Sequence, residues 1–188
     1  YKDTFNFDYS LELSTRPEKF MGEKKSWDLA EEALESSLKK SKLKYKINKG
    51  DGAFYGPKVD IHIKDSLGRS WQCATIQLDM QMPQRFEISY VGKDNKPHTP
   101  VVIHRVIFGS IERFIGILLE HLNGNLPLWL SPTQVRVINF TDRNEKSSQK
   151  VLNDIKKEIP SLRIDSDFRS TTVNEKVHDA ELLRIPYI

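Results

Sequence analysis

The stretch PVVIHRVIFGSIERFIGILLE, residues 100–120, joins an apolar β-run to an amphipathic helix. Residues 101–103 are apolar and β-branched, which predicts a buried strand. The next apolar residues recur at helical spacing and predict one helix face, made of Ile111, Phe114, Ile115, Leu118 and Leu122. His104 follows the strand and Arg113 falls in the first turn of the helix. Both positions suit side chains that serve a ligand lying on a sheet.

Composition places the chain among globular proteins. Of its 188 residues, 38% are hydrophobic and 29% are charged, and the formal net charge is only +3. This balance tolerates RNA as a partner without arguing for it. Cys73 is the single cysteine, which excludes an internal disulfide and predicts a cytoplasmic protein. No apolar run reaches the length of a membrane span. Because Tyr1 is not a start residue and an apolar run begins at the last residues, we expect a fragment.

Upstream of residue 100 the patterns predict an antiparallel sheet with helices packed on it. Period-two alternation and Gly-containing turns indicate strands, and a 3.6-residue period indicates a helix. The expected elements are a strand at 9–13, a helix at 27–43, a hairpin of strands at 58–64 and 71–79, and a strand at 86–91. The lysine-dense segment 39–46 fits two interpretations, a solvated helix end or a contact with phosphate.

The pattern changes near residue 127. Beyond it, strand-like segments at 134–140, 162–167 and 185–188 alternate with helical segments at 145–158 and 171–183. Such alternation predicts a parallel sheet covered by helices, and therefore a second, incomplete α/β domain. The fold class we expect for the whole chain is α+β.

Several polar residues are candidates for chemistry. Strict alternation gives one face of the 71–79 strand a mixed polar set, made of Trp71, Cys73, Thr75, Gln77 and Asp79. This face either meets water or binds a small polar ligand. Tyr55 and Lys58 flank a Gly-Pro turn beside the same strand pair. A lone histidine such as His104 is either a core residue or a ligand, and no His or Cys spacing completes a metal site.

Six stretches together resemble the threonyl-tRNA synthetase family of class II aminoacyl-tRNA synthetases, and they occur in that family's order. They are residues 13–19, 52–58, 72–79, 89–92, the run around His104, and 129–132. The resemblance implies that residues 1–126 are the C-terminal portion of a class II catalytic domain, built on an antiparallel sheet. It also implies that residues 127–188 are an incomplete α/β anticodon-binding domain.

The resemblance implies a reaction in which threonine and ATP give threonyl-adenylate, followed by transfer of threonine to tRNA(Thr). Mg²⁺ assists, and a Zn²⁺ held by one cysteine and two histidines binds the threonine. His104 matches the last zinc ligand, and the other two lie upstream of this chain in the family. The remaining matches are Tyr55 and Gln77 for threonine, Lys58 for the reacting carboxylate and α-phosphate, Gln72 and Thr75 for ATP, and Arg113 for adenine and the γ-phosphate.

Two features depart from the family pattern. The first two class II motifs are absent, and the first of them forms much of the homodimer interface of the complete enzyme. Residues 167–176 keep the family's Asp-x-Arg beginning but lose its usual acidic–basic–apolar–Gly continuation. Gln72 and Thr75 also fall on opposite faces of an alternating strand, so one of the two ATP contacts needs a bulge or a backbone contact, and Thr75 is the preferred assignment.

The sequence leaves two alternative functions open. The chain could belong to another class IIa synthetase, or to a synthetase-derived protein that binds RNA without catalysis.

Overall fold

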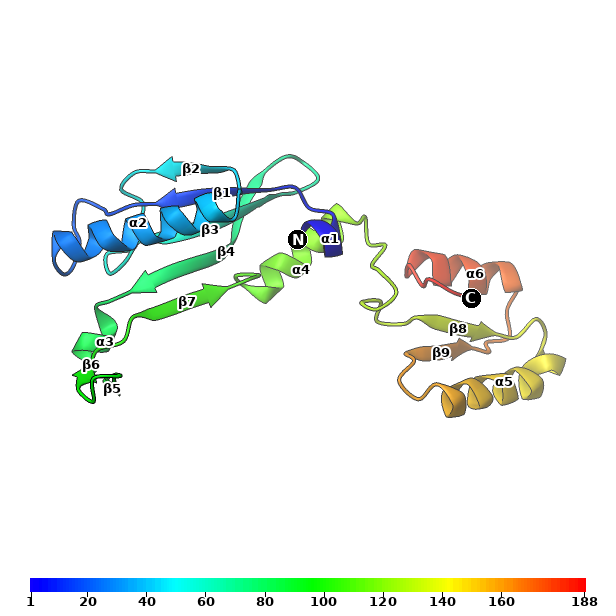
Figure 1. Cartoon of the computed structure of the whole chain (residues 1–188). Helices are drawn as coiled ribbons and strands as arrows, with labels where there is room; N and C mark the ends of the chain where they lie inside the picture. Colours follow the sequence, from blue (N-terminus) through cyan, green and yellow to red (C-terminus); the bar gives the residue numbers. More distant parts are fainter. The chain divides into compact units, whose positions relative to one another are not determined.

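The computed structural model describes residues 1–188, which form two compact units, Tyr1–Leu118 and Leu119–Ile188 (Figure 1). The first unit contains α1 (Lys2–Phe5), β1 (Tyr9–Ser14), α2 (Lys24–Lys40), β2 (Tyr45–Asn48), β3 (Lys58–Lys64), β4 (Ser70–Asp79), α3 (Met82–Arg85), β5 (Tyr90–Val91), β6 (Pro97–His98), β7 (Val102–Val106) and most of α4 (Ile111–His121). The second contains β8 (Val135–Ile138), a 3-10 turn η1 (Asp142–Asn144), α5 (Glu145–Glu158), β9 (Ile164–Asp167) and α6 (Val173–Leu182). The predicted α+β class is confirmed.

A five-stranded sheet in the order β2-β1-β3-β4-β7 organises the first unit. All of its pairings are antiparallel except that of β1 with β2. Helix α2 packs on one face of the sheet because its apolar residues recur at helical spacing, and burial of each large side chain contributes about 2 kcal/mol. The resulting core comprises Leu11, Leu13, Leu34, Leu38 and Val59. Polar residues are therefore left for the opposite face.

A β-bulge in β4 changes which side chains share a face. The pairing of β3 with β4 matches Ile61 to Ala74 and then His62 to Gln72, so Cys73 is the extra residue. Strict alternation had put Cys73 on the polar face, and this expectation is wrong because the bulge resets the parity. Cys73 is buried, at 2% exposure. Gln72 consequently joins Thr75 on the polar face, as the bulge alternative required.

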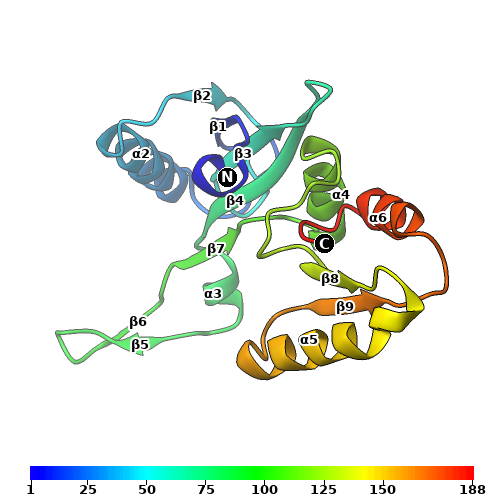
Figure 2. The ribbon, with the colours of Figure 1, turned by 90° about the vertical axis from the view of Figure 1, so that its right-hand side faces the viewer.

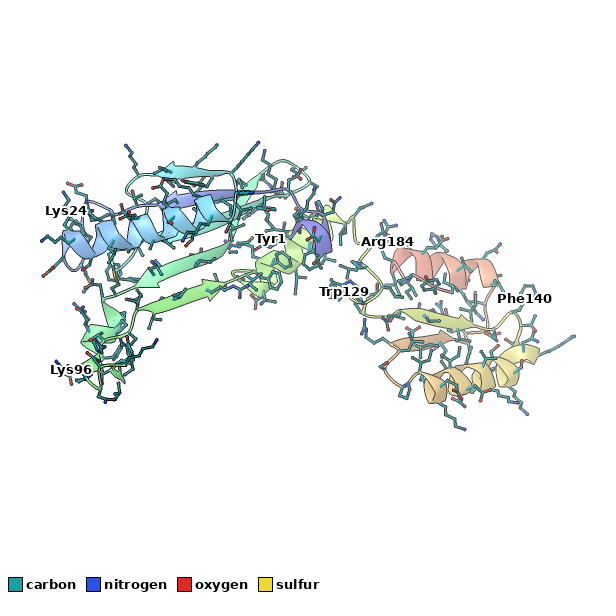
Figure 3. All side chains as sticks on the ribbon, viewed as in Figure 1. Tyr1, Lys24, Lys96, Trp129, Phe140 and Arg184 are labelled. Carbon is teal, nitrogen blue, oxygen red and sulfur yellow. The ribbon has the colours of Figure 1, made fainter.

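In the first unit two predicted elements are corrected and one element was missed. The strand expected at 86–91 is only β5, which pairs with β6 in a separate two-stranded hairpin, with Lys96 at its turn (Figure 3). Strand β2 was not expected, because the lysine-dense sequence has no apolar alternation. Strand β7 was expected to be buried but is the exposed edge of the sheet, with Ile103 62% exposed. Apolar β-branched composition indicated strand correctly but not its place in the sheet.

Lysines follow α2 into β2 and lie at the surface. Lys42, Lys44 and Lys46 are exposed, and the structure contains an ion pair only for Lys39, with Glu35. The solvated-surface and phosphate-contact interpretations of this segment both agree with that placement.

An aromatic cluster connects α1 to α4. The Phe114 ring lies 5.5 Å from Phe5, 6.1 Å from Phe7 and 4.4 Å from Phe108, measured between ring centroids. Phe114, Ile117 and Leu118 are the buried residues of α4, whereas Ile111 and Ile115 of the predicted apolar face are about half exposed. Because Phe114 is held by three rings, the cluster fixes the rotation of α4 about its axis and so the position of Arg113.

The second unit confirms the expected parallel pairing. Strands β8 and β9 are parallel, and Tyr187 adds a parallel bridge to Val135. Helices α5 and α6 lie on opposite sides of the two strands (Figures 1 and 2). Lys176 is fully buried and donates to the Asn139 side-chain oxygen at 2.5 Å and to its backbone carbonyl at 3.2 Å. No helix in either unit is long and apolar enough to cross a lipid bilayer.

Candidate active site

Six of the seven predicted site residues line one open cavity of about 540 Å³ on the polar face of the first unit's sheet. They are Tyr55, Lys58, Gln72, Thr75, Gln77 and His104. The strand register explains the convergence, because Lys58 on β3, Gln77 on β4 and His104 on β7 are direct neighbours across three strands. Side chains paired in this way share a face and lie close together.

The seventh predicted residue, Arg113, does not line this cavity and instead contacts the backbone of Gln72, which does. Its Nη2 donates to the backbone carbonyl of Gln72 at 2.8 Å, beside the bulge. Gly109 precedes α4 with φ of +67°, and a Cβ there would lie 2.9 Å from Arg113 Nη2 and 3.0 Å from the Cys73 carbonyl oxygen. A side chain at this position is therefore both strained and crowded. The Arg113 backbone amide also donates to Ser110 Oγ at 3.4 Å, in the first turn of α4.

The turn between Gly56 and Lys58 brings an aromatic hydroxyl onto the cavity wall. The Tyr55 hydroxyl donates to Gln77 Oε1 at 2.9 Å, and the Tyr55 ring meets the His104 ring edge-on at 6.1 Å. A Cβ on Gly56 would collide with the Leu78 carbonyl oxygen, so only glycine permits this approach. This single donor leaves a second lone pair on Gln77 Oε1, so both the oxygen and the amide N–H₂ can serve a ligand.

Lys58 supplies a cation beside two carboxylates. Its Nζ lies 2.7 Å from Asp60 Oδ2 and 3.3 Å from Asp51 Oδ2. Partial burial lowers the pKa of Lys58, but the two carboxylates raise it by more, so the net pKa is above its ordinary value. The amine is therefore charged throughout the neutral range and suits a group that develops negative charge.

His104 is oriented by a buried carboxylate. Its Nε2 lies 2.9 Å from Asp79 Oδ2, and the Asp79 side chain is 0% exposed while that of His104 is 49% exposed. Burial raises the pKa of Asp79, but hydrogen bonds from His104 and from the Met82 and Gln81 amides lower it further, and the net shift is downward. The carboxylate is thus ionised and fixes the tautomer that carries a proton on Nε2.

Two of the residues that organise this site received no role from the sequence, since Asp60 was not a candidate and Asp79 was only placed on the polar face. Asp60 and Asp79 are 1% and 0% exposed, and each accepts hydrogen bonds from predicted site residues. A signal was present, because both carboxylates alternate with apolar residues on their strands and so fall on the polar face. Alternation does not show which residues pair across neighbouring strands. That pairing was needed to identify the site residues that hydrogen-bond to these two carboxylates.

No group of three or more His, Cys, Asp or Glu side chains lies together in the chain as a metal site. His104 is accordingly a single candidate ligand, with Nδ1 facing away from Asp79. A histidine whose second nitrogen is bound to a carboxylate is the usual arrangement of a metal-ligating imidazole. The chain fits one ligand of such a site and not a complete site.

The family model for the class II tRNA synthetase core domain (G, H, P, S and T) matches residues 8–122. The chain belongs to this family. Threonine--tRNA ligase from Clostridium tetani is 52% identical over 98% of this chain and 28% of its own length. This chain therefore spans a little over a quarter of the length of the relatives that it matches.

Solved structures agree with this assignment. The crystal structure of the RNA binding domain of threonyl-tRNA synthetase from Cryptosporidium parvum Iowa II has a TM-score of 0.92 and 38% identity, covering 100% of this chain and 48% of that one. The putative threonyl-tRNA synthetase ThrRS-1 from Aeropyrum pernix has a TM-score of 0.76 and 30% identity, covering 98% of this chain and 44% of that one. The resemblance to threonyl-tRNA synthetases that the sequence predicted is therefore confirmed.

Proposed function

We propose that this chain is part of a threonine–tRNA ligase. The threonine carboxylate oxygen attacks the α-phosphorus of ATP, pyrophosphate leaves, and threonyl-adenylate forms. The terminal ribose hydroxyl of tRNA(Thr) then attacks the carbonyl carbon, and AMP leaves. The observation that carries the proposal is the convergence of Tyr55, Lys58, Gln77 and His104 on one cavity wall. The names of the curated relatives support the choice of threonine over other class II substrates.

Each proposed role follows from side-chain chemistry. Lys58 holds the reacting carboxylate and α-phosphate, where two negative groups approach one another and a fixed cation lowers the barrier. Tyr55 and Gln77 bind threonine through a hydroxyl and an amide that are already hydrogen-bonded to each other. Arg113 stacks on adenine and pairs with the γ-phosphate, since its guanidinium is planar and permanently charged. Gln72 and Thr75 bind ATP, with Mg²⁺ on the phosphates.

We further propose that His104 supplies one ligand of a Zn²⁺ and that the remaining ligands come from protein outside this chain. When bound, such a metal ligates the amino and hydroxyl groups of threonine. A site that must bind a hydroxyl rejects the isostere lacking it far better than an apolar pocket does, where discrimination is only about 10²-fold. Asp79 holds the imidazole nitrogen Nε2 of His104, so Nδ1 is the nitrogen that would ligate the metal.

Other parts of the proposal concern partners and location. We propose that residues 1–126 complete a catalytic domain and that residues 127–188 belong to an anticodon-binding domain for tRNA(Thr). The complete enzyme is proposed to be a cytoplasmic homodimer. Since this chain lacks the first two class II motifs, we expect no threonyl-tRNA formation by the 188-residue chain alone.

The test is amino-acid-dependent ATP–pyrophosphate exchange by the full-length protein that carries this segment. We expect exchange with threonine, weak exchange with serine, none with valine or proline, and loss of exchange with a zinc chelator. Lys58→Ala should abolish it, whereas Lys64→Ala is a matched control, because Lys64 is on the same face of β3 but exposed at its far end. Folded, zinc-loaded protein with no exchange for any amino acid would instead support an RNA-binding protein without catalysis.

A further inference from the structure

Asp60 lies beneath the cavity wall with every lone pair of its carboxylate in use. Oδ1 accepts from Gln72 Nε2 at 2.6 Å and from Thr75 Oγ1 at 2.8 Å. Oδ2 accepts from Lys58 Nζ at 2.7 Å and from Ser14 Oγ at 2.9 Å. A carboxylate offers about four acceptor positions, so these four donors saturate it. At 1% exposure it has no access to water that could substitute for them.

This saturation decides what the wall offers to a ligand. A threonine hydroxyl has one hydrogen, and Thr75 gives it to Asp60, so Thr75 faces the cavity as an acceptor. Gln72 Nε2 directs its hydrogens at Asp60 and at Thr75 Oγ1, 3.3 Å away, which leaves its carbonyl oxygen for a ligand. The two neighbouring side chains thus present acceptors only.

Two acceptors repel phosphate, whose ionised oxygens are acceptors too, and they attract a hydroxyl or amine. Lys58 binds the same carboxylate, so the group bound by Gln72 and Thr75 lies beside the cation proposed to hold the α-phosphate. In a nucleotide, the ribose hydroxyls are closer to that phosphate than the adenine amine is. The complementary ligand group is therefore a ribose hydroxyl, of ATP or of the terminal adenosine of tRNA.

We propose that Asp60 is a positioning residue that fixes the hydrogen-bond polarity of Gln72 and Thr75, so that this wall accepts hydrogen bonds from a ribose. This inference rests on the proposed function for the identity of its ligand, but not for the polarity itself. Asp60 touches no ligand and acts only through the side chains that it holds.

The isosteric variant Asp60→Asn reverses this polarity. The charged Lys58 must keep an acceptor, so the amide oxygen turns towards it and the new N–H₂ faces Gln72 and Thr75. Both side chains then turn a donor into the cavity. Ser14→Ala is the matched control, because it removes a hydrogen bond to the same carboxylate from a buried residue that does not line the cavity.

The first measurement uses the 188-residue chain and needs no substrate. We expect the Gln72 side-chain amide protons to be protected from solvent exchange in the parent chain and in Ser14→Ala, and to lose that protection in Asp60→Asn, as followed by NMR. Equal protection in all three would overturn the polarity assignment. If Asp60→Asn does not fold, Thr75→Val replaces it and should leave Gln72 bound to Asp60.

The second measurement compares ATP with 2′-deoxy-ATP and 3′-deoxy-ATP in pyrophosphate exchange by the full-length protein. We expect the parent to prefer ATP over at least one analogue by about tenfold or more in kcat/KM, because the missing hydroxyl leaves an acceptor on the cavity wall without its donor once the nucleotide covers it. Asp60→Asn and Thr75→Val should reduce that preference to about threefold or less, whereas Ser14→Ala should keep it.

Binding of tRNA, measured without transfer because a deoxy terminus can lack the attacking hydroxyl, separates the two sources of the ribose. If Asp60→Asn keeps the preference for ATP over its deoxy analogues but no longer binds tRNA ending in adenosine more tightly than tRNA ending in 2′- or 3′-deoxyadenosine, the wall is assigned to the tRNA terminus. If Asp60→Asn loses activity equally with ATP and with every deoxy analogue, its preference for ATP is unchanged. Asp60 would then have only a structural role, and the proposal would be refuted. If the parent shows no exchange at all, the proposed function fails, while the NMR comparison still decides the polarity.

Discussion

Two substitutions of Asp79 should separate two contributions to the free energy of unfolding. Asp79→Asn removes the negative charge, whereas Asp79→Ala also removes the oxygen that accepts hydrogen bonds. Asp79 Oδ1 accepts from the backbone amides of Gln81 at 3.0 Å and Met82 at 2.9 Å, and Oδ2 contacts His104. Asp79→Ala leaves the buried Gln81 amide and the partly buried Met82 amide unpaired at about 1.5 kcal/mol each, or about 3 kcal/mol in total. Asp79→Asn keeps Oδ1 for both amides and weakens only the half-exposed His104 contact, at about 1 kcal/mol.

Urea unfolding at neutral pH measures this difference. Followed by tryptophan fluorescence in a Trp129→Phe background, the transition reports the first unit, where Trp27 and Trp71 remain. With an m-value of about 2 kcal/mol/M, the midpoints of the two variants should differ by about 1 M. The matched control is Asp94→Ala, which removes the equivalent His98 contact where both side chains are about half exposed, and it should shift the midpoint little. Equal destabilisation by Asn and Ala would refute the reasoning.

Three further outcomes follow from the fold. Burial raises the pKa of Asp65, but hydrogen bonds from Trp71 and Arg69 outweigh it and lower the pKa to about 2. This stabilisation is present above pH of about 4 and is lost towards pH 2, so the stability gap between the parent and Asp65→Asn should close over that interval in acid unfolding. Leu34→Ala should cost about 2–5 kcal/mol in urea unfolding, against less than about 0.5 kcal/mol for the exposed Leu29→Ala on the same helix. Replacing Lys44 and Lys46 by valine should make edge strand β2 self-associate in sedimentation, whereas arginine at both positions should not.

Local pattern was sufficient for most elements. Period-two alternation placed β3 at its observed bounds, and the helical period did the same for α5, because each buries one face. The pattern failed at β5, where a hairpin carries apolar residues without burying them, as Tyr90 at 55% exposure shows. It also failed at β2, whose lysines gave no alternation although pairing with β1 holds the strand.

The candidate site shows where sequence spacing stops being informative. Gln72 and Thr75 are three residues apart, a spacing that strict alternation assigns to opposite faces, yet the bulge at Cys73 brings both to Asp60. Nothing in the local sequence requires the bulge. The need for it arises on β3, where a buried carboxylate is stable only if donors from the neighbouring strand reach it.

The same reasoning explains why the cavity is built on buried acids. A carboxylate at 1% exposure is destabilising unless its lone pairs are filled, and Asp60 fills them with side chains that also face the ligand. Any movement of Gln72 or Thr75 towards a different hydrogen-bond pattern would leave that buried charge short of a donor. The need to satisfy the buried charge of Asp60 therefore also restricts the wall to one hydrogen-bond polarity. A substitution that removes this charge, such as Asp60→Asn, should remove the restriction on polarity as well.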